Sequence, residues 1–175
     1  MRQVQVVPYK DQWPNLFLEE AVRIREVFGE EVIDIHHIGS TAVPGLAAKP
    51  IIDIMPVVRD IMQVDQYDRQ MAAIGYEGKG EFGIPGRRYF RKGGDNRSHH
   101  VHVFQQGDKG VTRHLAFRDY LRSHPDIARK YGAKKRELAG QFPTDMEAYI
   151  NGKSQLVQEI EQMALAWHQN IRLQS

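Results

Sequence analysis

The sequence lacks cysteine, long apolar runs and any marked excess of charge. With no cysteine among its 175 residues, disulfides, thiolate zinc sites and cysteine catalysis are excluded. No apolar run is long enough to cross a bilayer and the first residues lack a signal-peptide core, so we expect a cytoplasmic protein without a membrane partner. A formal net charge of +2 argues against nucleic acid as a partner. Nothing in the composition constrains the oligomeric state.

What the chain does contain is typical of a globular protein. Hydrophobic residues make up 41% of the sequence and charged residues 26%. This length can bury a sizeable core, so we expect a single domain over residues 1–175. Apolar and β-branched runs predict strands, listed here in chain order: Val32–Ile38, Ile51–Val58, Arg87–Lys92 and His99–Gln105.

Helical spacing predicts most of the remaining elements. One helix precedes the first strand, a second runs from Asp60 to about Ile74, and the pattern is helical from about Val111 onward. Thr144, with a glutamate three residues later, forms a capping-box pattern that predicts the start of the last helix. The glycine-rich stretch 77–86 predicts either a loop over a site or an irregular connection.

The segment at 39–50, between the first two strands, carries residues suited to binding phosphate. Gly39 allows backbone to approach a phosphate, while Ser40 and Thr41 can donate hydrogen bonds to it. Lys49 adds a positive charge. The alternative is a tight turn with a capping serine.

Several polar side chains lie within otherwise apolar strands. Asp53 is costly to bury unless a cation, a metal or hydrogen-bond donors lie nearby. His100 and His102 share one face of their strand because side chains alternate. Two histidines and a carboxylate would suit Zn²⁺, Mn²⁺ or Fe²⁺ better than Mg²⁺. Alternatively, the histidines are neutral, hydrogen-bonded wall residues, and Asp53 pairs with Lys49 or an arginine.

A further group of cations lies on the predicted hairpin and just beyond it: Arg87, Arg88, Arg91, Lys92 and Arg97, followed by Arg113 and Arg118. Arg87, Tyr89 and Arg91 share one face of the strand at 87–92, and Arg88 and Lys92 lie on the other. Arginine grips phosphate bidentately, so a phosphorylated ligand fits this group. A solvated strand edge protected by charge is the alternative.

The string from Gly39 to Asp53, Val7-Pro8-Tyr9, His99–Val103 and Phe117–Arg122 together resemble the GrpB family of the nucleotidyltransferase (polymerase-beta-like) superfamily. The resemblance covers nearly the whole chain. It implies an α/β (α+β) fold, in which a mixed sheet has flanking helices and is followed by a helical C-terminal part.

The resemblance also implies a metal site. The superfamily pattern places two carboxylates at like-facing strand positions, where they hold metals that bridge the phosphates of a nucleotide. Here the first is Asp53, while Met55 occupies the second position and cannot replace a carboxylate for Mg²⁺. A third carboxylate lies on a later strand, a place that the strand with His100 and His102 is expected to take. Asp53, His100 and His102 are then the candidate metal ligands, Asp53 is the candidate catalytic residue, and Mg²⁺, Mn²⁺ or Zn²⁺ is the candidate cofactor.

The function expected from this resemblance is binding of a nucleotide or another phosphorylated small molecule, with nucleotidyl transfer as a candidate activity. The expected phosphate-binding residues are Gly39, Ser40, Thr41, Lys49 and Arg91. One alternative is a non-catalytic binding or regulatory module with a degenerate metal site. The other is a metal-dependent hydrolase that uses Asp53, His100 and His102.

Overall fold

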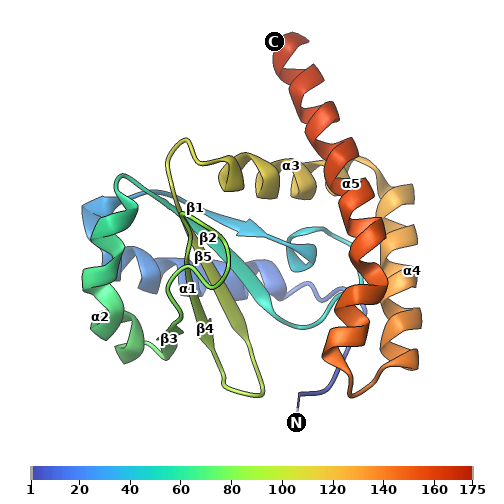
Figure 1. The fold of residues 1–175 in the computed structure, drawn as a ribbon, viewed down its shortest axis with the longest axis horizontal. Helices are drawn as coiled ribbons and strands as arrows, with labels where there is room; N and C mark the ends of the chain where they lie inside the picture. Colours follow the sequence, from blue (N-terminus) through green and yellow to red (C-terminus); the bar gives the residue numbers. More distant parts are fainter. Residues whose placement is uncertain (1, 175) are drawn as a thin grey trace. The chain divides into compact units, whose positions relative to one another are not determined.

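The computed structural model describes residues 2–174, in which helices accompany a mixed β-sheet (Figure 1). This confirms the predicted α+β class. The helices are α1 (Trp13–Phe28), α2 (Asp68–Ala73), α3 (Lys109–Ser123), α4 (Pro125–Gln141) and α5 (Met146–Gln174). The strands are β1 (Val32–Ile38), β2 (Ile52–Val58), β3 (Tyr76–Gly78), β4 (Arg88–Lys92) and β5 (His99–Gln105). Short 3₁₀ segments are η1 (Gly29–Glu31), η2 (Ser40–Ala42) and η3 (Ile61–Tyr67).

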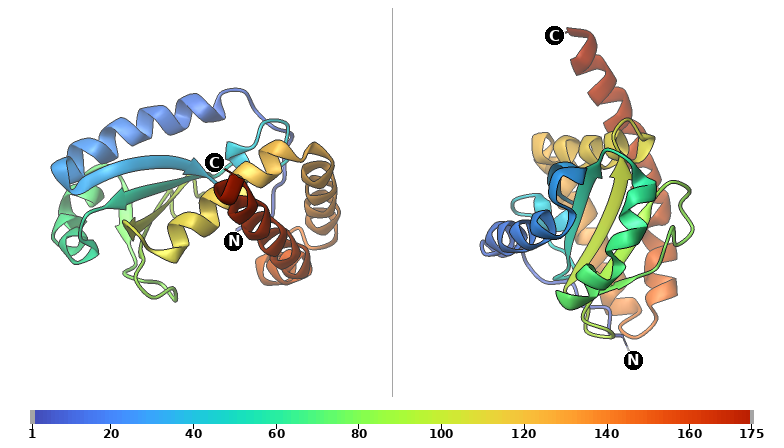
Figure 2. Two further views of the ribbon diagram at one scale, coloured as in Figure 1. Left: turned by 90° about the horizontal axis from the view of Figure 1, so that it is seen from above. Right: turned by 90° about the vertical axis from the view of Figure 1, so that its left-hand side faces the viewer.

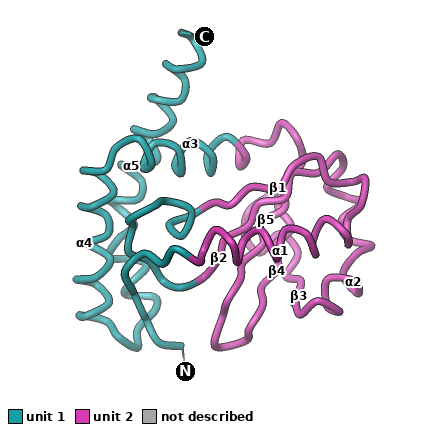
Figure 3. Tube along the Cα trace, turned by 180° about the vertical axis from the view of Figure 1, so that it is seen from behind, with its two compact units in different colours: residues 1–11, 39–50, 112–175 teal, residues 12–38, 51–111 magenta. Residues whose placement is uncertain are grey.

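The chain divides into two compact units, each made from segments that are far apart in sequence (Figure 3). One unit comprises residues 12–38 and 51–111 and holds the sheet. The other comprises residues 1–11, 39–50 and 112–175. The single domain expected over residues 1–175 stays a prediction.

The sheet has five strands in the order β1-β2-β5-β4-β3. The pair β2 and β5 is parallel, and the other neighbours are antiparallel. Its three central strands carry buried apolar residues on both faces: Ile54, Val101 and Phe90 lie on one face, and Met55, Phe104 and Tyr89 lie on the other. Such near-continuous apolar runs suit strands that are covered on both sides. The predicted strands at these places are confirmed to within one residue.

Helix α1 packs along one face of the sheet (Figure 2). The ring of Phe17 stacks on that of His37, with centroids 4.9 Å apart. At the far edge of this face, Glu20 accepts a hydrogen bond from Lys92 Nζ at 3.0 Å. Burial tends to raise the pKa of Glu20, but the hydrogen bond and charge of Lys92, together with the nearby Tyr76 hydroxyl, outweigh this and lower it. This face is therefore committed to packing, which leaves the opposite face for polar side chains.

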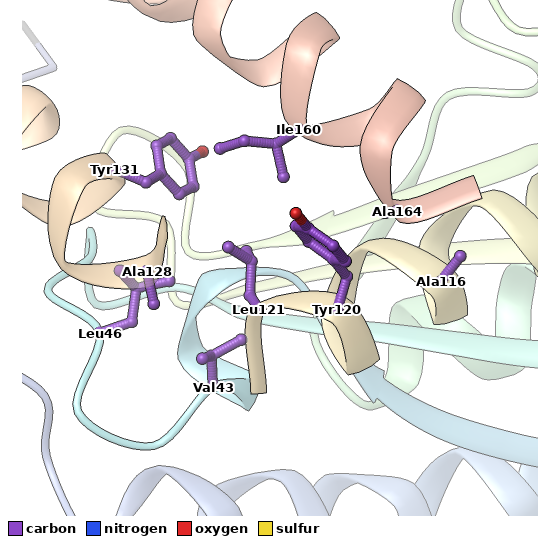
Figure 4. Close-up of a cluster of buried hydrophobic side chains, with 9 residues drawn as sticks. All are labelled: Val43, Leu46, Ala116, Tyr120, Leu121, Ala128, Tyr131, Ile160 and Ala164. Atoms are coloured by element: carbon purple, nitrogen blue, oxygen red, sulfur yellow. The ribbon is translucent and has the colours of Figure 1, made fainter. Parts of the chain in front are cut away.

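The unit that comprises residues 1–11, 39–50 and 112–175 has an apolar core between its helices (Figure 4). Helices α3, α4 and α5 and the segment 39–50 contribute to it; the buried members are Val43, Leu46, Ala116, Tyr120, Leu121, Ala128, Tyr131, Ile160 and Ala164. Arg122 Nε donates to the carbonyl oxygen of Ala42 at 2.9 Å and so ties α3 to the segment after Gly39. The N-terminal arm joins the same unit, since Val7 and Ala48 exchange backbone hydrogen bonds of 2.9 and 3.0 Å.

Three local predictions were wrong in detail. The last helix is capped by Asp145, whose Oδ1 accepts from Ala148 N at 3.0 Å, and not by Thr144. The helix predicted from Asp60 begins as the 3₁₀ segment η3, with Asp60 accepting from Met62 N, and becomes α-helical only at α2. The stretch predicted to be irregular from residue 77 opens with the edge strand β3.

Within residues 2–174, the helices are too short or too polar to pass through a bilayer.

Candidate functional site

A row of neighbouring residues crosses all five strands on the face of the sheet opposite α1. Ile38 on β1 pairs with Asp53 on β2, and Asp53 pairs with His100 on β5. His100 pairs with Arg91 on β4, and Arg91 with Glu77 on β3. Directly paired residues point to the same side of a sheet. The register therefore brings a carboxylate, an imidazole and a guanidinium side by side.

Asp53 is the centre of this group. His102 Nε2 lies 3.0 Å and His100 Nδ1 3.5 Å from Asp53 Oδ1. One candidate ligand atom from each of the three residues lies within 4.8 Å of the others. The side chain of Asp53 is 27% exposed, and those of His100 and His102 are 18% and 13% exposed. The structure thus brings together the three predicted ligands, in a place that solvent still reaches.

Asp53 is held in its ionised form. Burial by itself would raise the pKa of this carboxyl group. Hydrogen bonds from His100 and His102, and the charge that these rings can carry, outweigh burial and hold the pKa of Asp53 well below its usual range. The group is therefore an anion at neutral pH, ready to bind a cation or to orient a donor.

Arg87 completes the surroundings of His102. Its Nη1 lies 3.3 Å from His102 Nδ1. A guanidinium can only donate, so Nδ1 accepts this hydrogen bond. The neutral ring then carries its proton on Nε2, from which it donates to Asp53 Oδ1. Arg87, His102 and Asp53 form a chain of hydrogen bonds with one fixed direction.

This direction bears on metal binding. A histidine that ligates a metal through one ring nitrogen usually donates the other N–H to an acceptor. For His102 the other nitrogen faces a donor, so ligation through Nε2 requires Arg87 to turn away. No donor opposes His100 in this way, because its buried Nε2 has no hydrogen-bond partner among the described residues. Ligation through Nδ1 would leave that Nε2–H without an acceptor there. Asp53 and His100 are thus the better-placed pair for a metal, and His102 fits only after a rearrangement.

Tyr89 forms the wall behind the two histidines. Its ring centroid lies 5.6 Å from that of His100 and 5.5 Å from that of His102. The guanidinium of Arg87 lies 4.9 Å from the same ring centroid. The sequence placed Arg87, Tyr89 and Arg91 on one strand face, but it gave no signal that Tyr89 and Arg87 meet histidines on another strand. The edge-of-sheet alternative is wrong for Arg87, which is 7% exposed.

The other cations of this strand are engaged elsewhere. Arg88 pairs with Asp65, and Lys92 pairs with Glu20 on the α1 side of the sheet. Arg91, a predicted phosphate-binding residue, lies beside His100 in the row and contacts Glu77 at 3.3 Å. Of the predicted cationic group on this strand, Arg87 and Arg91 share the face of Asp53.

The predicted phosphate-binding segment lies in the other unit. Gly39 has φ +74°, a conformation that favours glycine, and Ser40 starts the 3₁₀ turn η2. Thr41 is buried, so its hydroxyl is less accessible than that of Ser40. Lys49 Nζ lies 3.7 Å from Met146 Sδ and 5.4 Å from the ring centroid of Tyr149. Phosphate binding by these residues stays a prediction.

Comparison with known proteins identifies the family. The family model described as "GrpB protein" matches residues 3–163. The chain belongs to the GrpB family. UPF0157 protein YqkA of Bacillus subtilis is 51% identical over 166 residues, which are 95% of this chain and 48% of YqkA. The chain therefore spans about half the length of that relative. The crystal structure of the conserved protein GrpB from Enterococcus faecalis is 44% identical, has a TM-score of 0.91, and matches 94% of this chain and 99% of its own.

A more distant structure defines the fold of this GrpB-family chain. The Cid1 poly(U) polymerase bound to Mg and 3'-dATP aligns with a TM-score of 0.51 at 12% identity, over 74% of this chain and 44% of Cid1. At this identity the likeness concerns the fold alone. It supports the nucleotidyltransferase-type sheet that the resemblance implied.

The Arg87–His102 contact makes a testable prediction about metal affinity. In Arg87→Gln, the amide oxygen can accept a hydrogen bond from a protonated Nδ1 of His102. The ring then carries its proton on Nδ1, which frees Nε2 for a metal. We expect the affinity for Zn²⁺ to rise by about tenfold or more, the scale on which outer partners tune metal ligands. Zn²⁺ titration followed by calorimetry, with melting curves to verify folding, provides the measurement.

Two control variants separate this effect from a general loosening of the site. Arg87→Lys keeps a donor-only cation and should show no gain. Arg87→Gln combined with His102→Ala should lose the gain, because the gain acts through the His102 ring. Equal Zn²⁺ affinity in the parent and Arg87→Gln would contradict the assigned direction of the hydrogen bonds.

Proposed function

We propose that this protein binds a nucleotide or another phosphorylated small molecule on the sheet face that carries Asp53. The observation that carries the proposal is the row Asp53–His100–Arg91 on three adjacent strands. An arginine beside a carboxylate–histidine group offers one position for phosphate and one for a cation that bridges to it. The side chains are partly exposed, so a ligand can reach them.

The fold supports this choice of ligand. The Cid1 poly(U) polymerase, which has the same kind of sheet, was crystallised with Mg and 3'-dATP bound. A divalent metal at Asp53 and His100 is the corresponding part of the proposal for this chain, with Mn²⁺ or Zn²⁺ favoured over Mg²⁺ because a histidine contributes. The metal would neutralise charge on the phosphates, and the residues of the chain would orient the phosphorylated ligand.

The segment from Gly39 to Lys49 is a second proposed phosphate-binding element. The turn of η2 presents Ser40 directly after a glycine in a left-handed conformation. Its hydroxyl can donate to a phosphate oxygen. Lys49 contributes a positive charge in the same unit.

The protein could bind its ligand either as an enzyme or as a non-catalytic binding module. The residue Met55 favours the non-catalytic module. Met55 shares the face of Asp53, since the two are two residues apart on β2, and it is 0% exposed. A second metal-bridging carboxylate is therefore missing at the expected position. A metal-dependent hydrolase built on Asp53, His100 and His102 is less favoured, because Arg87 faces the Nδ1 atom of His102.

Ligand binding tests the proposal directly. Nucleoside triphosphates and pyrophosphate, with Mn²⁺ present, should raise the melting temperature of the parent protein. Arg91→Ala should weaken binding at the sheet face, and Ser40→Ala should weaken binding at the separate segment 39–50, each by about 1–2 kcal/mol, the size of a charge-assisted hydrogen bond. Titration calorimetry of the parent and both variants gives the free energies.

Arg59→Ala is the matched control for the loss of one positive charge. Arg59 is exposed and directly follows β2 at the end away from Asp53, where its Nε donates to the carbonyl oxygen of Glu30 at 3.1 Å. Its replacement should leave ligand affinity unchanged. The proposal fails if no phosphorylated compound binds to the parent, or if Arg59→Ala weakens binding as much as Arg91→Ala.

Nucleotidyl transfer can be tested separately from binding. Because Met55 replaces a carboxylate, we expect Mg²⁺-dependent release of pyrophosphate from nucleoside triphosphates to be slow or absent. Met55→Asp should strengthen Mg²⁺ binding but lower the free energy of unfolding by several kcal/mol, because the new carboxylate is buried. Rapid Mg²⁺-dependent transfer by the parent protein would overturn the ranking of binding above catalysis.

A further inference from the structure

Phe82 is an exposed aromatic residue with an unusual backbone. Its φ is +47°, and it is the one non-glycine residue with positive φ in the described part of the chain. Bulky residues rarely adopt this region. The residue is nevertheless 54% exposed, so burial of its ring does not account for the conformation. Such outliers persist only where the surroundings hold them in place.

The surroundings that hold Phe82 belong to the candidate site. Arg87 Nη2 donates to the carbonyl oxygen of Phe82 at 2.9 Å, and Arg87 Nε donates to that of Glu81 at 3.2 Å. The Glu81 carboxylate accepts from Gly86 N at 2.6 Å and closes the loop. The same guanidinium binds His102. Arg87 therefore couples the position of Phe82 to the hydrogen-bond chain that ends at Asp53.

The Phe82 ring is packed against its neighbours in part and exposed in part. It stacks on Tyr89, with ring centroids 5.1 Å apart and planes 6° from parallel. Tyr89 in turn contacts the rings of His100 and His102. The guanidinium of Arg91 lies 5.7 Å from the Phe82 ring centroid. A partly exposed ring, next to a cation and stacked on the tyrosine that contacts His100 and His102, suits a flat aromatic group attached to a phosphate.

We propose that Phe82 is the base-stacking residue of the ligand site: its exposed ring stacks on the base of a nucleotide whose phosphates lie toward Arg91. The inference rests on the proposed function and narrows it from phosphorylated compounds to nucleotides. Stacking depends little on the identity of the base, because every base has a π-face. Purine and pyrimidine nucleotides should therefore both respond to changes at Phe82.

The experiment compares ATP, UTP and tripolyphosphate, each with Mn²⁺, by titration calorimetry. Phe82→Ala should weaken ATP and UTP binding about 5- to 150-fold and leave tripolyphosphate unchanged. Phe82→Leu keeps an apolar side chain but no ring and should lose affinity as Phe82→Ala does. Phe82→Trp should retain or improve nucleotide affinity. Melting curves verify that each variant is folded.

The outcomes separate this inference from the proposed function. If the parent binds nucleotides and Phe82→Ala binds them equally well, the stacking role is overturned and the proposed function stands. Equal losses for nucleotides and tripolyphosphate also overturn it, because Phe82 would then act through the loop and not through a base. If the parent binds neither nucleotides nor tripolyphosphate, the proposed function itself fails.

Discussion

The hydrogen bond between His102 and Asp53 is the interaction on which the candidate site depends. It joins two parallel strands whose residues are 49 positions apart, and it satisfies a carboxylate that would otherwise be costly to place among apolar side chains. Because Arg87 donates to the other nitrogen of the same ring, the direction of the bond is fixed. The position of the loop that carries Phe82 follows from the same guanidinium.

This arrangement changes how an Asp–His–His group is understood. Proximity alone marks the three residues as a metal site, and their atoms do lie close enough together. Hydrogen-bond direction adds a second condition: a donor, Arg87, faces the other ring nitrogen of His102, whereas no donor faces that of His100 among the described residues. A buried Met55 and a donor facing His102 both move the site away from two-metal chemistry and toward binding of an anionic ligand. Family membership and fold specify neither a ligand nor a substrate.

Much of the fold follows from local sequence, and the site does so only in part. The bounds of β1, β2 and β5 were predictable because each strand is an apolar run. The glycine turn before Arg97 separates the last two strands of the sheet in the sequence. The prediction that Asp53 lies beside the strand of His100 rested on the resemblance to the GrpB family, because hydrophobic periodicity does not indicate the order of strands in a sheet. The Arg87–His102 contact depends on the register between β4 and β5, and the orientation of Phe82 depends on Arg87. No local pattern encodes either. The cap of α5 was misplaced by one residue because threonine and aspartate are both good caps. Of Thr144 and Asp145, it is Asp145 that accepts from Ala148 N.

The most direct test of the central claim is the protonation state of the His102 ring. Nitrogen-15 NMR of the histidine side chains, assigned by comparison with His102→Ala, distinguishes a protonated from an unprotonated ring nitrogen. At neutral pH and without added metal, the account predicts a proton on Nε2 of His102 and none on Nδ1. A ring protonated on Nδ1, or on both nitrogens, would contradict the hydrogen-bond chain from Arg87 to Asp53.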